Sequence, residues 1–246
     1  MLSLMNQVRL LAFGVLKDTL GPDSAAITLP DGVSVGDLLD IISAKHPGIS
    51  LRGIAVSINA EYADRARLLQ NGDEVALLPP VSGGAATESE KLADFTAPAT
   101  LTRAKIEAEN WVNAAKSGED GAVVVFDGIV RNNSRGRRTL YLDYEAYEEM
   151  ALTQMKALAA EARANFGVRQ VNIVHRLGRL QIGETSVLIV VASAHRSQAF
   201  EACRWVIDTL KKTVPIWKKE TFVDGSVWAD GEPFPPGIGA GVPDAP

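Results

Sequence analysis

The sequence predicts an α+β protein of two domains joined by a linker. Its 246 residues are enough for two ordinary domains, and 46% hydrophobic with 22% charged residues is typical of a globular chain. Strand-like and helix-like patterns occur on both sides of residues 85–99, a stretch rich in Ala, Thr, Ser, Glu and Pro without sustained periodicity. We therefore expect domains over residues 1–84 and 100–231, with residues 85–99 as the linker.

The first domain is expected to follow the order β-β-α-β-β. A short helix fits residues 14–21, and Ser34 with Asp37 forms an imperfect capping box for a helix that ends before Pro47. Alternating or apolar runs predict the strands, over residues 7–13, 25–29, 54–58 and 74–78. This order within about 80 residues indicates one helix packed across a mixed sheet.

The second domain mixes longer helices with β-branched strands. The spacing of apolar residues predicts helices over residues 101–115, 148–166 and 197–212. Strands are expected at residues 122–130, 140–147, 170–176, 185–193 and 216–223, with a polar basic loop over 131–138. Residues 232–246 are rich in proline and glycine, and we expect a disordered tail there.

Composition excludes several classes of protein. The net charge is −5, so no global field attracts the chain to nucleic acid or a membrane, and no apolar run reaches the ~18 residues of a membrane span. The start does not read as a signal peptide, and the single cysteine, Cys203, cannot form an internal disulfide, which fits a reducing cytoplasm. The three histidines lack metal-ligand spacing, so we expect no metal and no bound cofactor.

One stretch is unusual for the middle of a chain. An apolar strand-like run ends in two prolines, and a short tail then reaches Gly83-Gly84. Glycine has no side chain, so such a tail can enter a narrow channel, as when a carrier protein presents its C-terminus to an active site. Here the chain continues with Ala85.

Cations concentrate at three places in the second domain: the Arg131–Arg138 loop, the pair His195-Arg196, and the run Lys211, Lys212, Lys218 and Lys219. His195-Arg196 follows an apolar strand and precedes a helix, a position that favours anions. A pocket for a phosphorylated small molecule, with a lysine as acid or base, is one reading. The alternative is that the basic loop is solvated surface and the lysines complement a helix dipole. Cys203 lies on an apolar stripe, which favours a buried, inert thiol.

Two segments resemble the subunits of one enzyme. Residues 7–84 resemble the small, ubiquitin-like subunit of molybdopterin synthase, through Gly72-Asp73-Glu74-Val75 and the ending Pro79-Pro80-Val81-Ser82-Gly83-Gly84. Residues from about 90 to 231 resemble its large subunit, through the stretches 121–132, 175–178, 193–197 and 211–220. The resemblance implies a fusion of both subunits, with a β-grasp domain followed by an α/β hammerhead domain through which the protein dimerises.

The resemblance also implies a reaction and a set of site residues. In that family, the terminal glycine of the small subunit carries a thiocarboxylate, and two sulfur transfers to cyclic pyranopterin monophosphate build the dithiolene of molybdopterin. By position, Lys211 and Lys218 match the essential lysines, with Lys211 the favoured site of covalent or acid–base work. The residues Arg131, His195 and Arg196 match the anion-binding group, and Phe126 lines the same region.

The peptide bond between Gly84 and Ala85 departs from the family's pattern, because Gly84 then has no free carboxylate. We expect a Gly-Gly-specific protease, of the JAMM metalloprotease type, to cut there, and an adenylating and sulfurating enzyme to act on Gly84. One alternative is that the fusion works uncut with another sulfur delivery. Another is a ubiquitin-like modifier or adaptor precursor whose second half is a non-catalytic scaffold.

Overall fold

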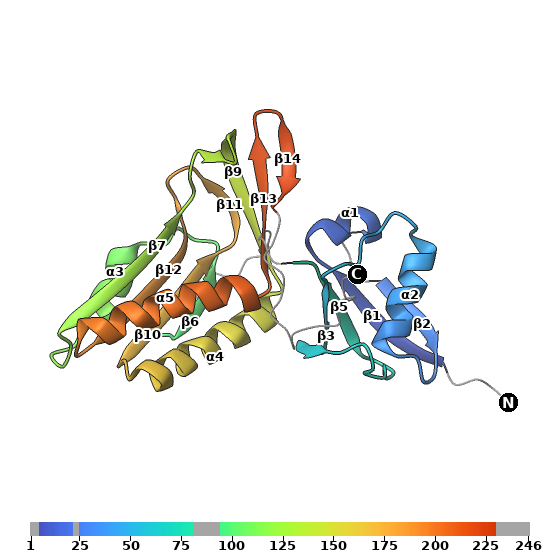
Figure 1. Cartoon of the computed structure of the whole chain (residues 1–246), viewed down its shortest axis with the longest axis horizontal. Helices are drawn as coiled ribbons and strands as arrows, with labels where there is room; N and C mark the ends of the chain where they lie inside the picture. Colours follow the sequence, from blue (N-terminus) through green and yellow to red (C-terminus); the bar gives the residue numbers. More distant parts are fainter. Residues whose placement is uncertain (1–4, 22–24, 81–93, 230–246) are drawn as a thin grey trace, which may run out of the picture. The chain divides into compact units, whose positions relative to one another are not determined.

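The computed structural model describes residues 5–21, 25–80 and 94–229, which form two compact units (Figure 1). The first unit ends with residue 80 in the described part of the chain, and the second spans residues 94–229. Most of the expected linker and the expected tail lie outside the described residues, whereas residues 94–99 belong to the second unit. Within the described ranges, no helix is long and apolar enough to cross a membrane.

The first unit is a β-grasp domain. Its sheet has the order β2-β1-β5-β3-β4, with β1 parallel to β5 at the centre and the other pairs antiparallel. Helix α2 packs Val35, Leu38, Leu39 and Ile42 into the core. The elements are β1 (Met5–Ala12), the 3-10 helix η1 (Gly14–Leu16), α1 (Lys17–Leu20), β2 (Ala25–Pro30), α2 (Val35–Lys45), β3 (Ala55–Ile58), β4 (Glu61–Ala63) and β5 (Glu74–Leu78).

The start of α2 confirms the predicted capping box. The Asp37 amide donates to Ser34 Oγ at 3.2 Å, and the Ser34 amide donates to Asp37 Oδ2 at 2.9 Å. These two bonds satisfy donors that a helix N-terminus leaves without partners. The prediction missed β4, because a three-residue strand after the turn at Asn59 and Ala60, both at positive φ, carries too little pattern to detect.

The second unit contains three helices and two sheets. One sheet has the order β6-β10-β12-β7, and the other the order β11-β9-β13-β14, with β8 paired to β9. Their strands are β6 (Ala99–Thr102), β7 (Ala122–Ile129), β8 (Asn133–Ser134), β9 (Arg137–Ala146), β10 (Gln170–Arg176), β11 (Gly178–Gln181), β12 (Thr185–Ser193), β13 (Ile216–Phe222) and β14 (Gly225–Trp228). The helices are α3 (Ala108–Ala115), α4 (Glu148–Phe166) and α5 (Arg196–Thr213).

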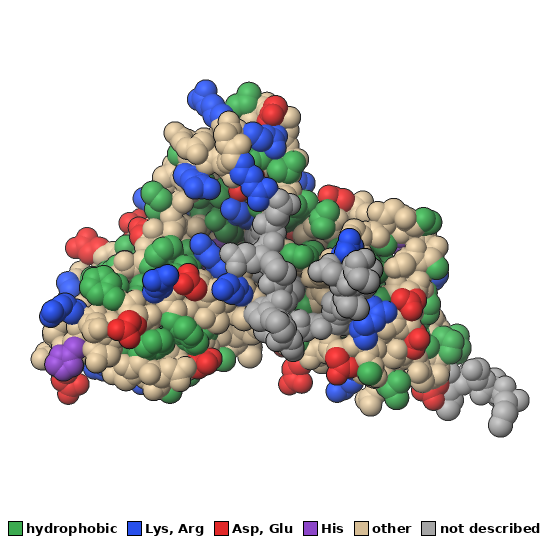
Figure 2. Space-filling model, viewed as in Figure 1, with side chains coloured by type: hydrophobic (Ala, Val, Ile, Leu, Met, Phe, Trp, Pro, Cys, Tyr) green, Lys and Arg blue, Asp and Glu red, His purple; other side chains and the backbone are tan. Residues whose placement is uncertain are grey.

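The second of these sheets carries much of the basic surface. Lys and Arg side chains gather over β9, β13 and β14 (Figure 2). Arg137 pairs with Asp224 at 2.7 Å and stacks 3.9 Å from the Phe222 ring, which ties the β8–β9 hairpin to the β13–β14 hairpin. The prediction of a loop over residues 131–138 is therefore wrong in part. Strands β8 and β9 form a tight hairpin there, which turns at Arg135 and Gly136, both at positive φ.

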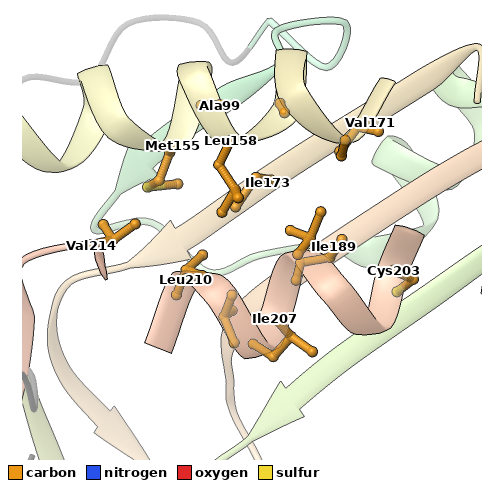
Figure 3. Close-up of a cluster of buried hydrophobic side chains, with 14 of the residues drawn as sticks. Ala99, Met155, Leu158, Val171, Ile173, Ile189, Cys203, Ile207, Leu210 and Val214 are labelled. Carbon is orange, nitrogen blue, oxygen red and sulfur yellow. The ribbon is translucent and has the colours of Figure 1, made fainter. Parts of the chain in front are cut away.

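The main core lies between the first sheet and helices α4 and α5 (Figure 3). In Figure 3, Met155 and Leu158 of α4 and Leu210 of α5 converge on Ile173 and Ile189 of the sheet. Trp111 and Ala115 of helix α3, together with Ile106 just before it, cover the opposite face of that sheet. Strand β12 is buried on both faces, which explains its continuous apolar run.

Two further expectations differ from the structure. The predicted helix over residues 101–115 is α3 only from Ala108, because Ala99–Thr102 pairs in parallel with β10 as β6. That pairing depends on a strand more than 70 residues away, which local spacing does not reveal. Strand β11 was also missed, in the stretch between β10 and the Gly183 turn, and it pairs with β9.

Candidate active site

Two neighbouring elements, β7 and α5, set the ends of the candidate site. Strand β7 starts beside the end of β12, where Ala122 pairs with Ser193, and α5 starts three residues after Ser193. Because β7 is antiparallel to β12 and α5 turns back along the same sheet, β7 and α5 run in the same direction (Figure 1). Arg131, which follows β7, and Lys211, in the last turn of α5, therefore lie toward one end of the unit.

The predicted site residues do not all meet within one chain. Fifteen residues of α5 separate Arg196 from Lys211, which at 1.5 Å per residue is about 22 Å. We call the region of Arg131, Lys211 and Lys218 the lysine end, and the region of His195 and Arg196 the histidine end. Phe126 is half-buried in the middle of β7, where it packs on the core beneath α5. Gly84 and Ala85 lie outside the described residues.

The histidine end contains an open pocket of about 560 Å³ at the N-terminus of α5. His195 and Arg196 are exposed in it, and Phe200 leaves 62% of its surface accessible. Gly121 lines the pocket, and a β-carbon there would press into the carbonyl oxygen of Ala194. The pocket is lined by Gly121, Ala194, His195, Arg196, Ser197, Phe200 and Glu201. Its cations and helix terminus suit an anion.

The lysine end is built around the short connection between α5 and β13. Lys211 is exposed in the last turn of α5, and β13 begins at Ile216. Lys218 Nζ lies 2.9 Å from Glu220 Oε1, and the side chains of these two residues are 34% and 6% exposed. A buried carboxylate thus holds Lys218 in one orientation. Arg131 is exposed and follows Val130, which is buried against Leu142 and Leu180 of the second sheet.

A buried polar layer lies beneath Lys218, and the sequence did not reveal it. Tyr144 of β9 stands opposite Lys218 of β13 in the strand register. Burial raises the pKa of the Tyr144 phenol above its ordinary value of 10. Ser186 Oγ donates to the carbonyl of Gly128 at 2.8 Å. The expected strands 140–147, 185–193 and 216–223 all pass through this region, but a strand pattern does not mark which polar residue is buried.

Two other titratable groups are structural, as the sequence suggested. Cys203 is buried on α5, and burial raises the pKa of its thiol to about 11, so it is a poor nucleophile. His175 is buried against the Tyr144 ring at 5.2 Å between ring centroids. Its Nδ1 lies 3.0 Å from the Arg176 carbonyl oxygen, which can only accept, so Nδ1 carries the proton.

His175 is expected to make the second unit sensitive to acid. Burial lowers its pKa from 6.5 to about 4, so the unfolded chain binds more protons below pH 6.5. Stability is therefore complete above pH 6.5 and falls by about 3 kcal/mol as the pH drops toward 4. All four tryptophans lie in the second unit, so their fluorescence reports its unfolding by urea. In His175→Asn this part of the pH dependence should vanish; equal slopes for both proteins would contradict the assignment.

Comparison with known proteins identifies both halves. The family model described as MoaE protein matches residues 101–213, and that of the ThiS family matches residues 10–84. The molybdopterin synthase catalytic subunit of Oryza sativa subsp. indica is 39% identical over 150 residues, which cover 61% of this chain and 76% of that protein. Its counterpart in Pyrococcus abyssi is 41% identical over 124 residues, covering 50% of this chain and 84% of that protein.

A solved structure agrees with the sequence comparisons. The crystal structure of molybdopterin synthase from Staphylococcus aureus has 40% sequence identity and a TM-score of 0.51, covering 52% of this chain and 94% of that chain. The relatives are catalytic subunits, and the region that the MoaE model matches contains the histidine end and, of the lysine end, Arg131 and Lys211. The chain therefore belongs to the molybdopterin synthase catalytic-subunit family of sulfurtransferases and is a fusion of the small and large subunits of that enzyme.

Proposed function

We propose that this molybdopterin synthase transfers sulfur from a thiocarboxylate on Gly84 to cyclic pyranopterin monophosphate and so builds the dithiolene of molybdopterin. The observation that carries the proposal is the presence, in one chain, of a ThiS-family domain that ends at residue 84 and a catalytic domain with lysines at one end of α5. The first supplies a sulfur-carrying tail and the second supplies cations that suit it. No bound cofactor is needed for this reaction.

The two lysines have different surroundings and, we propose, different roles. A thiocarboxylate sulfur is a nucleophile, and nearby cations stabilise the carboxyl group of the tail, the substrate phosphate and the negative charge that develops. Lys218 is held by Glu220 and suits a fixed positive contact. Lys211 is exposed at the end of a helix and suits covalent or acid–base work. Arg131 completes the lysine end, and Phe126, in the middle of β7, lines the same substrate pocket in the proposal.

A second copy of the chain completes this pocket in the proposal. His195 and Arg196 lie about 22 Å from Lys211 along α5, too far to contact one small substrate together with it. Apolar side chains are exposed along β7 and α5, with Val125 at 40%, Ile129 at 59% and Phe200 at 62%. Within the described residues, β7 pairs only with β12, so its other edge is open. A homodimer would cover this surface and bring the histidine end of one copy to the lysine end of the other.

Activity is proposed to require cleavage between Gly84 and Ala85. While the peptide bond is intact, Gly84 has no carboxylate that the adenylating and sulfurating enzyme could activate. The partner that cuts the bond is proposed to be a Gly-Gly-specific protease of the JAMM metalloprotease type. Once free, the tail can carry sulfur to the lysine end.

Blocking that cleavage is expected to abolish the function. Ala85→Pro should resist proteolysis, because proline after the cut bond removes the amide N–H and stiffens the chain. In cells that lack their own synthase, molybdoenzyme activity should fall to background with Ala85→Pro and return when residues 1–84 and 85–246 are produced as separate chains. Thr87→Pro is the control for a proline nearby. Wild-type activity from Ala85→Pro chains of intact mass would instead support a fusion that works uncut.

A further inference from the structure

We propose that Arg169 is a positioning residue that, through its ion pair with Asp120, fixes the shape of the pocket at the histidine end. The inference rests on the proposed function, because it concerns the part of the substrate pocket that the histidine end supplies. Gly121 and Ala194 both line this pocket, and Gly121 directly precedes β7 whereas Ala194 directly follows β12. The shape of the pocket therefore depends on how the turn before β7 is held beside the end of β12.

This turn and the end of β12 approach each other closely. The Gly121 amide donates to the carbonyl of Ser193 at 3.1 Å, and the next residue, Ala122, pairs with Ser193 in the β7–β12 register. A β-carbon on Gly121 would press into the carbonyl oxygen of Ala194, so glycine is required there. Because Gly121 has no side chain, its backbone itself lines the pocket, and a movement of the turn changes the pocket directly.

Arg169 contacts the turn and both of its neighbouring elements. Its guanidinium donates to both carboxylate oxygens of Asp120, the residue before Gly121, with Nε 2.9 Å from Oδ1. The same guanidinium donates to the carbonyl of Ala115 at the end of α3. The backbone amide of Arg169 donates to the carbonyl of Ala192 in β12 at 3.1 Å. One residue thus joins the helix before the turn, the turn itself and the strand that leads to the pocket.

Asp120 is the buried member of the pair. Its side chain is 4% exposed, against 33% for that of Arg169, and it also accepts from the Ser117 amide at 2.9 Å. A buried carboxylate that loses its cation is strongly destabilised, so the turn would rearrange to bring it into water. A lysine ammonium cannot match both carboxylate oxygens as the planar guanidinium does. Arg169→Lys should therefore keep the charge and release the turn.

The test separates substrate binding from the chemical step. Purified full-length protein, as processed by the producing cells, is supplied with saturating thiocarboxylated carrier and varied cyclic pyranopterin monophosphate. In Arg169→Lys we expect KM to rise about 10-fold, because hydrogen bonds to a charged group of the substrate are weakened. We expect kcat to stay within about twofold, because Lys211 lies about 22 Å along α5 from Arg196. Asp120→Asn, which keeps the size of the side chain, should shift KM in the same direction.

The matched control is Arg179→Lys. Arg179 of β11 also contacts both carboxylate oxygens of an aspartate, Asp143 of β9, at 3.1 and 3.3 Å, but this pair does not line the histidine-end pocket. Its KM should equal that of the wild type. An equal rise of KM in Arg179→Lys and Arg169→Lys, or an unchanged KM in Arg169→Lys and Asp120→Asn, would overturn the inference. Loss of the folded state in both Arg169→Lys and Asp120→Asn, seen by tryptophan fluorescence, would also overturn it, because the pair would then serve the whole fold.

Arg196→Ala in the same assay separates the positioning role from the proposed function. If Arg169 acts through the pocket, Arg169→Lys should lower kcat/KM little further when Arg196→Ala is already present, whereas losses that add would show an independent effect and contradict the inference. If Arg196→Ala has the kinetics of the wild type, the proposed role of the histidine end fails. If Arg196→Ala is impaired while Arg169→Lys is normal, only the positioning role fails.

Discussion

Lys211→Ala is expected to abolish sulfur transfer while leaving the fold intact. Lys211 is exposed in the last turn of α5, so its truncation removes no core packing. If its amine does covalent or acid–base work, the rate with thiocarboxylated carrier should fall by about 10³-fold or more. The measurement is molybdopterin formation by the purified protein, with tryptophan fluorescence as the check on folding.

The neighbouring lysine supplies a matched control. Lys212 is equally exposed at the same helix end and complements the helix dipole as well as Lys211 does. Lys212→Ala should therefore stay within about twofold of wild type, as should Arg138→Ala on the exposed hairpin. If Lys211→Ala behaved like Lys212→Ala, the basic residues at this helix end would be solvated surface and the assignment of Lys211 would be wrong.

Local sequence signals predicted the elements that depend on local interactions. Helix α4 has the bounds that its apolar stripe predicted, and the Ser34–Asp37 capping box starts α2 one residue after the cap. Strand β5 also has its predicted bounds, because its apolar run lies between a turn and two prolines. In each case the residues that decide the structure lie within a few positions of one another.

The wrong or missed predictions concern segments whose structure depends on pairing with a strand that is distant in the sequence. Residues 99–102 form a strand only because β10 offers a parallel partner, and β11 forms only because β9 does. The position of Tyr144 opposite Lys218 was missed for the same reason, since it depends on the pairing of β9 with β13 and leaves no local pattern. The resemblance to a known family named the six described site residues, and the helix predicted over residues 197–212 already placed Lys211 at the opposite end from His195 and Arg196.

That separation leads to the second prediction with a large effect: two inactive chains should restore each other. Suppose that each pocket takes Lys211 from one copy and Arg196 from the other. A dimer of a Lys211→Ala chain with an Arg196→Ala chain then has one intact pocket and one that lacks both residues. With random pairing, about a quarter of all pockets are intact, so activity of the unseparated mixture should return to about a quarter of wild type, and that of isolated mixed dimers to about half. Each variant alone should be far less active.

The experiment co-expresses the two chains with different tags and isolates the mixed dimers by both tags. The matched control pairs Lys211→Ala with Lys218→Ala. Both of these residues belong to the lysine end, so the result of this pairing depends on where that end comes from. If both lysines of a pocket come from one copy, every pocket in this mixture lacks one of them, and no activity should return.

Recovery in the first pairing but not in the second would show that a pocket takes its two lysines from one copy and its arginine from the other. Absence of recovery in isolated mixed dimers would mean that the second copy does not complete the pocket, and that the 22 Å between Arg196 and Lys211 (about 1.5 Å for each of fifteen residues) separates two independent sites.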